Sequence, residues 1–400
     1  MSTGAEICHG GGGAGDDGDG GLPEDQMFEL LTRVSLDDLA ACRQVSAQWR
    51  RLTYEPAFGP QHCRRRADAV VSGYFVQGLA RNRYSATFVS MTTQTHPSSS
   101  SPPVVSLDFL PCAHVRVDAV SAHRGLACCV DADAEAAARM GGKASSARCY
   151  YACKPATRQW LALPSPRLRF PTAASAMVAR PAGTGDGSAA DFKILRLSVA
   201  TLRDRLRCEI FDSRRFAWRR SAEVMVWPES LVAAGPATRA HGAMHWLRWP
   251  DRLTGAEDIF AFDMKSETWR LIGLPPEIDD RAERWARRKL VTVEGKLCLV
   301  VIVGDEAEVW VITGYGMQHE RWEKKMVVRL KSLTVKEGSE LVLRDLCSAE
   351  VAFFNAVYRV VWYDFWKGKI AEVPVHHKCI QEVLKYESDL VPWDIDENKI

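Results

Sequence analysis

The sequence predicts a short α-helical block followed by an all-β region folded as a β-propeller of roughly five to seven blades. Residues 22–58 carry apolar side chains at helical spacing, and a strand-turn-strand pattern that ends in tryptophan recurs later with a period near 50 residues. We therefore expect a Gly- and Asp-rich flexible tail at residues 1–21, the helical block at 22–58, a linker at 59–69, the propeller at 70–392 and a second tail at 393–400.

The helical block opens with an amphipathic helix. Pro23 and the acidic pair Glu24 and Asp25 favour a helix start at this point. The apolar residues that follow have i, i+3, i+4 and i+7 spacing and define one face: Met27, Leu30, Leu31 and Val34. Ser35 and Asp38 have the spacing of a capping box, so a second helix is expected from Ser35 onward.

A third helix is predicted from apolar residues spaced by 3, 4 and 3 positions: Cys42, Val45, Trp49 and Leu52. The whole block has 37 residues, and isolated domains below roughly 40 residues usually need disulfides, metals or association to stay folded. No metal-ligand spacing occurs within it. We expect a partner protein to complete its core.

The ordered series LPxD, a Leu-Leu pair, a second Leu-rich turn, VSxxWRxL and P-x-F resembles an F-box, although Val34-Ser35 stands where that family commonly has Leu-Pro. The resemblance implies docking on the Skp-type adaptor of SCF-type cullin–RING ubiquitin ligases. By that analogy the adaptor contacts are Leu22, Pro23, Leu36, Leu39, Val45 and Trp49. The alternative is a small helical subdomain that packs on its own chain.

The strand-turn-strand repeat has two markers. Its tryptophans are Trp160, Trp218, Trp269 and Trp322, at intervals of 58, 51 and 53 residues, within the range of kelch repeats. Gly242 and Gly295 each precede the next of these tryptophans by 27 residues. A final copy without the tryptophan runs through residues 356–374, and residues 70–110 supply another. We expect the four tryptophans to pack between blades.

This region resembles the F-box-associated and kelch-like domains of plant F-box proteins. The blocks RGL, YACKPATRQWLALP, HGAMHWL, AFDMKSETW and GKLCL follow one another in the order familiar from that family, and YESDLVP resembles its C-terminal sequence. The double-glycine signature of kelch repeats is absent from the sequence. The resemblance implies a substrate-recognition adaptor that holds a client protein for ubiquitination.

Composition narrows the function classes. Lys plus Arg of 52 against Asp plus Glu of 50 leaves a net charge of +2, so no global field attracts nucleic acid or an anionic membrane. No apolar run reaches the ~18 residues of a membrane span, and we expect a cytosolic or nuclear protein. The 12 cysteines are scattered and lack Cys-x-x-Cys pairs, which favours reduced core thiols.

The sequence contains no convincing catalytic or cofactor site. There is no Gly-x-Ser-x-Gly elbow or phosphate-binding loop, and the cluster of His376, His377 and Cys379 has no second ligand pair for zinc. His241 and His245 are expected on one face of a strand as core or edge residues. We therefore predict a non-catalytic protein without metal or cofactor.

Two aromatic and basic segments are the candidate client contacts, because Trp, Tyr and Arg dominate interface energies. Their residues are Trp246, Arg248, Trp249 and Arg252 in the first segment, and Phe365 and Trp366 in the second. Packing of hairpins between blades would explain both segments equally well.

The sequence leaves two alternatives to the ligase adaptor open. One is a propeller enzyme or carbohydrate-binding module in which the F-box-like segment is only structural, and the other is an F-box protein that binds the adaptor outside any ligase. The client protein is not identified by the sequence.

Overall fold

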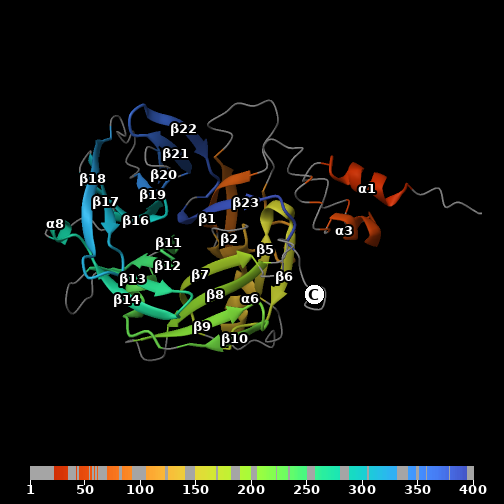
Figure 1. Ribbon diagram of the computed structural model, residues 1–400, viewed down its shortest axis with the longest axis horizontal. Coiled ribbons are helices and arrows are strands. Elements are labelled where there is room, and N and C mark those ends of the chain that lie inside the picture. Colours follow the sequence, from red (N-terminus) through yellow and green to blue (C-terminus); the bar gives the residue numbers. More distant parts are fainter. Residues whose placement is uncertain are drawn as a thin grey trace, which may run out of the picture.

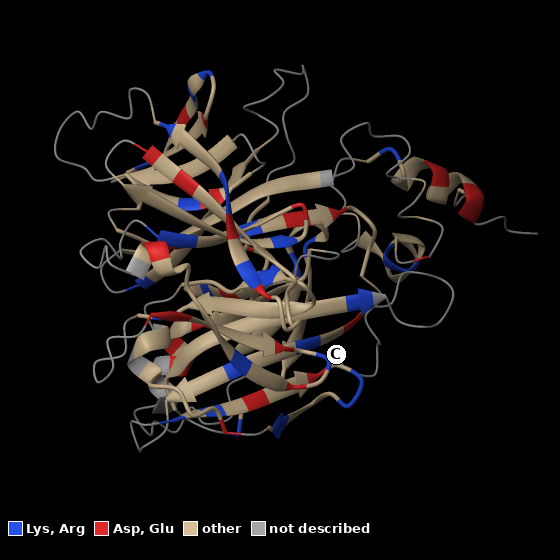
Figure 2. Ribbon diagram, turned by 60° about the vertical axis from the view of Figure 1, so that its left-hand side comes forward, with Lys and Arg blue, Asp and Glu red and all other residues tan. Residues whose placement is uncertain are grey.

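The computed structural model describes residues 22–34, 42, 45–53, 55, 58, 61, 70–80, 83–91, 105–121, 125–139, 149–167, 170–181, 190–199, 205–221, 223–232, 235–249, 257–279, 288–303, 306–330, 341–347, 351–356, 358–377 and 379–393. Two helices near the N-terminus lie outside a ring of β-sheets in both views (Figures 1 and 2). The predicted order of helices followed by a propeller is confirmed.

The N-terminal helices are α1 (Glu24–Leu31) and α3 (Ala47–Thr53). Pro23 is the N-cap residue of α1, as the sequence indicates. The third helix was predicted to run unbroken from Cys42, but Ser46 interrupts it: its Oγ accepts the backbone N–H of Trp49 at 3.1 Å and caps a new helix at Ala47. The predicted helix that starts at Ser35 lies outside the described residues.

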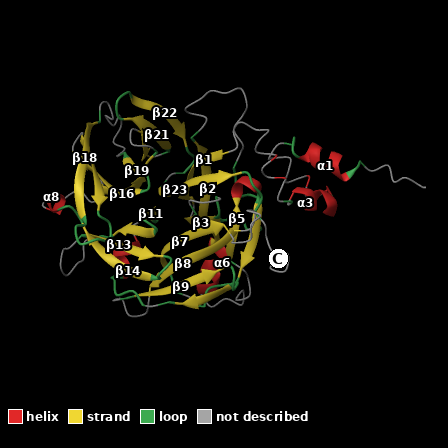
Figure 3. Ribbon diagram, in the orientation of Figure 1, coloured by secondary structure: helices red, strands yellow, loops and turns green. Residues whose placement is uncertain are grey.

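The described strands form six antiparallel sheets, which Figure 3 shows arranged as the blades of a ring. The strands of each blade are given from the innermost to the outermost. Blade I contains β23 (Ile380–Asp389), β1 (Val70–Ala80) and β2 (Arg83–Ser90). Blade II contains β3 (Val115–Val120), β4 (Ala127–Asp131), β5 (Tyr150–Lys154) and β6 (Gln159–Leu163). Blade III contains β7 (Thr172–Pro181), β8 (Ala190–Val199), β9 (Leu206–Asp212) and β10 (Ala217–Arg220).

The remaining blades have the same plan. Blade IV contains β11 (Thr238–Ala240), β12 (Ala243–Leu247), β13 (Asp258–Asp263) and β14 (Thr268–Gly273). Blade V contains β15 (Arg288–Val293), β16 (Lys296–Val303), β17 (Glu306–Thr313) and β18 (Arg321–Arg329), and blade VI contains β19 (Val342–Leu346), β20 (Val351–Ala356), β21 (Arg359–Asp364) and β22 (Gly368–Pro374). Short helical turns join some strands: α6 (Ala132–Arg139), α7 (Pro228–Val232), α8 (Pro276–Asp279) and the 3₁₀ turn η1 (Pro155–Thr157).

Equivalent turns explain the repeated glycine marker. In blade IV, His241 and Gly242 join the two inner strands with φ of 50° and 79°, and in blade V Glu294 and Gly295 do so with φ of 51° and 76°. Two consecutive positive φ values are required by the type I′ turn of a two-residue hairpin, in which glycine is favoured. The equal offsets in the sequence therefore mark the same hairpin in successive blades.

A second turn is repeated between the two outer strands. Asp212, Asp263 and Asp364 end the third strand of blades III, IV and VI, and each carboxylate accepts a backbone N–H from the residue two positions later at 2.6–3.0 Å. Such Asx turns fix the direction of the outer hairpin. The predicted copy at residues 356–374, which lacks the repeat tryptophan of the outer strand, is thereby confirmed as part of blade VI.

Each repeat tryptophan is the second residue of its outer strand. Trp218 donates its indole N–H to the Pro164 carbonyl of blade II at 2.7 Å, and Trp322 donates to the Gly273 carbonyl of blade IV at 2.8 Å. Trp269 packs against the hydrophobic core shared by blades III and IV. Trp160 is different, because it is 37% exposed and its ring meets Tyr151 of its own blade. Inter-blade packing thus holds for three of the four.

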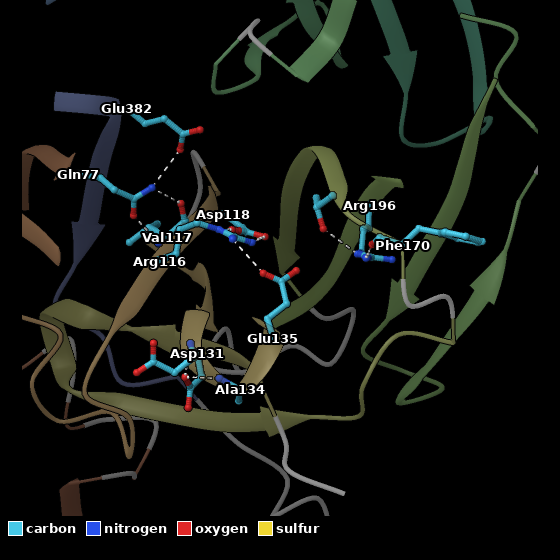
Figure 4. A network of polar contacts seen from close by, with 12 residues as sticks. Gln77, Arg116, Val117, Asp118, Asp131, Ala134, Glu135, Phe170, Arg196 and Glu382 are labelled. Carbon is cyan, nitrogen blue, oxygen red and sulfur yellow. Dashed lines mark hydrogen bonds and ion pairs between the residues drawn. The ribbon is translucent and has the colours of Figure 1, made fainter. Parts of the chain in front are cut away.

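The ring is closed by a strand from the other end of the chain. β23 pairs with β1 along residues 70–78 and contributes the inner strand of blade I. The side chain of Gln77 links this closure to blade II (Figure 4). Its amide oxygen accepts the Val117 N–H at 2.7 Å, and its amide nitrogen donates to the Val117 carbonyl at 3.3 Å and to Glu382 at 3.1 Å. In the same network Arg116 bonds Asp118 and Glu135, which ties α6 to the inner strand β3.

The propeller extends beyond its predicted end. Trp393, which the sequence analysis assigns to the C-terminal tail, is 4% exposed and packs in the core of blades II and III beside Phe192. Its backbone N–H and carbonyl bond the Gln159 amide at 2.7 and 2.6 Å. Lys154 also forms an ion pair with Asp389 and donates to the Val391 carbonyl, so the end of β23 and the segment after it are held on blade II.

Candidate functional site

The helical block has a small core and an exposed apolar surface. Leu31, Leu52 and Phe58 are each 2% exposed or less, and Trp49 is half-buried against them. Three other apolar residues face solvent instead, with exposed fractions of 50% for Leu22, 51% for Leu30 and 64% for Val45. Pro23 is also exposed, whereas Leu36 and Leu39 lie outside the described residues.

The first predicted client segment is mostly part of the core. Trp246 lies in β12 and is 1% exposed, tilted against Phe260. Arg248 is 4% exposed and bonds both carboxylate oxygens of Asp258 at 2.6 and 2.7 Å. Trp249 is 43% exposed, and Arg252 lies outside the described residues. Within this segment the structure leaves Trp249 as a surface aromatic residue.

The second segment divides in the same way. Phe365 is buried in the core of blades V and VI and meets Tyr363 edge-on at 6.4 Å. Trp366 is 68% exposed at the tip of the outer hairpin of blade VI, where Asp364 accepts its backbone N–H at 2.8 Å. Sequence alone could not separate these neighbours, because burial depends on which way the turn directs each side chain.

The exposed tryptophans of the two client segments, Trp249 and Trp366, lie on opposite faces of the propeller. Trp249 follows the end of a second strand, whereas Trp366 follows the end of a third strand, and successive strands of an antiparallel blade run in opposite directions. On one face of the propeller, turns join the first strand of each blade to the second and the third to the fourth; we call this the hairpin face. We call the opposite face the connection face. Trp366 lies on the hairpin face and Trp249 on the connection face, so they do not form one contact surface.

The histidines have structural contacts. His245 is fully buried; its Nδ1 donates to the Thr238 carbonyl at 3.2 Å and its Nε2 accepts from the Tyr315 hydroxyl at 2.7 Å. Burial lowers the pKa of His245 to about 4. His241 was expected on the same strand, but it lies in the β11–β12 turn, where its ring stacks on Tyr315 at 4.3 Å. The two rings nevertheless contact the same residue, Tyr315.

Among the described residues, no group of three or more His, Cys, Asp or Glu side chains is placed to hold a metal ion. The ten described cysteines are free, and most are buried. Burial raises the pKa of the Cys208 thiol to about 12, which disfavours the thiolate that metal binding and nucleophilic attack require.

The inner strands enclose a central channel of about 720 Å³. Residues of β3, β7, β11, β15, β19 and β23 line it, which places one inner strand of every blade around it. The walls carry both charges, and over the whole molecule basic and acidic residues are interspersed (Figure 2). Sequence reasoning missed this channel, because its residues are scattered singly over six repeats.

A closed six-bladed propeller preceded by short helices is the class of protein that these features define. The model of the F-box associated beta propeller domain matches residues 78–384, and the chain belongs to this family. It is 23% identical to the F-box protein At5g49610 of Arabidopsis thaliana over 358 residues, which covers 85% of this chain and 87% of that protein. It is 25% identical to the Arabidopsis F-box protein At5g41720 over 158 residues, covering 39% and 78%.

Similar solved structures are more distant. A chain of a nidogen/laminin complex gives a TM-score of 0.37 at 12% identity, covering 79% of this chain and 98% of that one. A protein from Lactobacillus plantarum gives 0.39 at 8% identity, covering 76% and 82%. Likenesses at this level carry no functional argument.

Proposed function

We propose that this chain is the substrate-recognition subunit of an SCF-type cullin–RING ubiquitin ligase. Its helical block docks on a Skp-type adaptor and its propeller holds a client protein for ubiquitination. The observation that supports this most directly is the exposure of Leu22, Leu30 and Val45 beside a core of only a few buried residues. Apolar surface of this kind is stabilised when a partner covers it.

The mechanism is proximity. A client held by the propeller keeps its lysines near a ubiquitin carrier bound elsewhere in the assembly, which raises their effective concentration. No catalytic residue of this chain is needed for that step. Belonging to the F-box associated family supports this role in general, while the partners of this particular chain are part of the proposal.

The docking surface is tested with exposed residues, because their substitution leaves the core intact. We expect Leu22→Asp combined with Val45→Asp to weaken capture of a Skp-type adaptor at least tenfold, since two carboxylates would be buried at the interface. Val327→Asp is the matched control, because Val327 is 50% exposed on the propeller. Capture is measured by pull-down of the purified chain. Unchanged binding by the double variant contradicts the proposal.

The client face is tested separately. Trp366→Ser should reduce the amount of ubiquitinated client that co-purifies after proteasome inhibition if clients bind the hairpin face, and Trp249→Ser should do so if they bind the connection face. Adaptor binding serves as the internal control, because neither residue lies in the helical block. Retention of every client by both variants would remove these tryptophans as contacts.

Localisation and assembly follow from the same proposal. No helix of the described residues is long and apolar enough to cross a membrane. We place the protein in the cytosol or nucleus, where its adaptor, cullin and RING partners act. Recovery of the adaptor without cullin in the pull-down would instead favour an F-box protein that works outside a ligase.

A further inference from the structure

The central channel is lined by an arginine, Arg239, with one guanidinium nitrogen that has no acceptor in the part of the chain that the structure describes. Arg239 lies on β11, near the hairpin-face end of the channel, and is one of the lining residues. Its Nη1 atom is fully buried and has no hydrogen-bond partner among the described residues. Leaving a buried donor unsatisfied costs about 1–3 kcal/mol, and more when the group is charged.

The electrostatic surroundings of Arg239 increase this cost. Burial lowers its pKa, and the nearby guanidinium of Arg180 lowers it further, with no described carboxylate acting in the opposite direction. Arg180 is an exposed residue next to the last position of β7, the inner strand of the adjacent blade, and is not itself part of the channel lining. The neighbouring charges of Arg239 among the described residues therefore add to a positive potential at this end of the channel.

Three carboxylates of the channel lining are already matched to donors and do not compensate for Arg239. Asp118 accepts from Arg116 at 2.5 Å and Glu387 pairs with Lys385 at 3.3 Å. Asp345 accepts from the Tyr74 hydroxyl at 2.9 Å, and burial raises the pKa of this carboxyl. Glu294 also lines the channel but lies on an exposed turn.

Lys289 is a second cation further along the channel. The Thr292 hydroxyl, on the same strand as Lys289, donates a hydrogen bond to the Arg239 carbonyl. Lys289 is three residues from Thr292, so it lies about 10 Å further along the channel than Arg239. Burial, followed by Arg344, lowers the pKa of Lys289 to about 8, while Asp345 and Glu382 act in the opposite direction. Its ammonium group would be stabilised by an additional anion.

We propose that the central channel binds a small molecule bearing phosphate or carboxylate groups, with Arg239 as its principal charged contact. The planar guanidinium matches both oxyanions, and charge-assisted hydrogen bonds to it are stronger than neutral ones. The channel volume of about 720 Å³ falls within the ~300–1,000 Å³ of small-molecule sites. A ligand with two anionic groups would also reach Lys289. This inference goes beyond the adaptor function and does not rest on it.

The probes are pyrophosphate and citrate, added to the full-length chain at constant ionic strength with chloride as the reference salt. We expect one or both to raise the melting temperature saturably and to give a binding isotherm by calorimetry. A response to pyrophosphate alone assigns a phosphate ligand, to citrate alone a carboxylate ligand, and to both a general oxyanion site. The absence of a saturable response to either probe overturns the proposal.

Substitutions then locate the site. Arg239→Met should weaken the response roughly tenfold or more, while Arg239→Lys, which keeps the charge and loses the fork, should give an intermediate value. Without probe, Arg239→Met should melt at the same temperature as the parent chain or higher, because a buried guanidinium nitrogen that has no acceptor among the described residues has been removed. Arg214→Met, on an exposed turn of blade III, is the control and should leave the response unchanged. Full binding by Arg239→Met contradicts the assignment, and if that variant does not fold, the Arg239→Lys comparison decides in the same way.

Discussion

At the scale of single residues, the structure shows which polar groups the sequence could not place. His245 was correctly expected to be a structural residue, because apolar neighbours surround it in the sequence. Its partner Tyr315, 70 positions away, could not be predicted, since the contact joins two blades. The buried pair of Arg248 and Asp258 was also missed, although its two residues belong to the same blade, and its arginine was predicted as a surface contact.

The buried histidine makes a prediction about acid stability. Its folded pKa of about 4 lies below the ordinary value of 6.5, so the unfolded chain binds the proton more readily. The stabilising contribution is complete above pH 6.5 and is lost as the pH falls from 6.5 to 4. When the pH is lowered from 7 to 4.5, the free energy of unfolding of the parent chain should fall by about 2 kcal/mol more than that of the His245→Gln variant.

Urea unfolding at both pH values measures this difference, with His319→Gln as the control. His319 lies in the exposed turn between β17 and β18, so its substitution removes a surface imidazole and leaves the buried one in place. Parallel pH dependence in the parent and His245→Gln chains would show that the buried imidazole is not responsible.

At the scale of elements, the sequence predicted the repeated unit well. Equal spacings of Gly242 and Gly295 marked the same inner hairpin, and the tryptophans marked the same position on each outer strand. These features are local, since turn geometry and strand pairing between neighbours dictate them. The third helix was predicted too long. A serine within a helical pattern does not by itself indicate a helix end, but the Ser46 side chain caps a new helix in the structure.

Two equivalent tryptophans form a matched test of inter-blade packing. Trp218 is 2% exposed and donates to Pro164 across the blade boundary, whereas Trp160 is 37% exposed. We expect Trp218→Phe to destabilise the propeller by about 1–3 kcal/mol through the lost hydrogen bond and volume, and Trp160→Phe by less than about 0.5 kcal/mol. Thermal and urea unfolding provide the comparison. Equal effects at the two positions would exclude a bridging role for Trp218.

At the scale of the whole molecule, the number of blades and their closure could not be derived from the repeats. The sequence indicated roughly five to seven blades, and the structure has six. The ambiguity came from blade I, which is assembled from both ends of the chain and therefore shows no complete repeat in the sequence. The channel has the same origin, because each inner strand contributes only a few residues to it.

The closure can be tested at Gln77, which is completely buried between blades I and II. Gln77→Met should cost about 1–3 kcal/mol, because it leaves the Val117 N–H without an acceptor in the core. Gln381→Met, on an exposed position of the same sheet, is the control and should change stability by less than about 0.5 kcal/mol. Both values come from denaturant unfolding. A neutral Gln77→Met variant would show that the closure does not depend on this side chain.

The pairing of β1 with β23 also affects how the protein is made. Gln77 and Glu382 are 305 positions apart in the chain, so at about 5–20 residues per second the ribosome needs on the order of 15–60 s between their synthesis. During that interval the first hairpin has no inner neighbour, and five finished blades cannot form a ring. We therefore expect the inner edge of β1 to stay unpaired until β23 has been made, and a chain that ends before β23 to lack the strand that closes the ring.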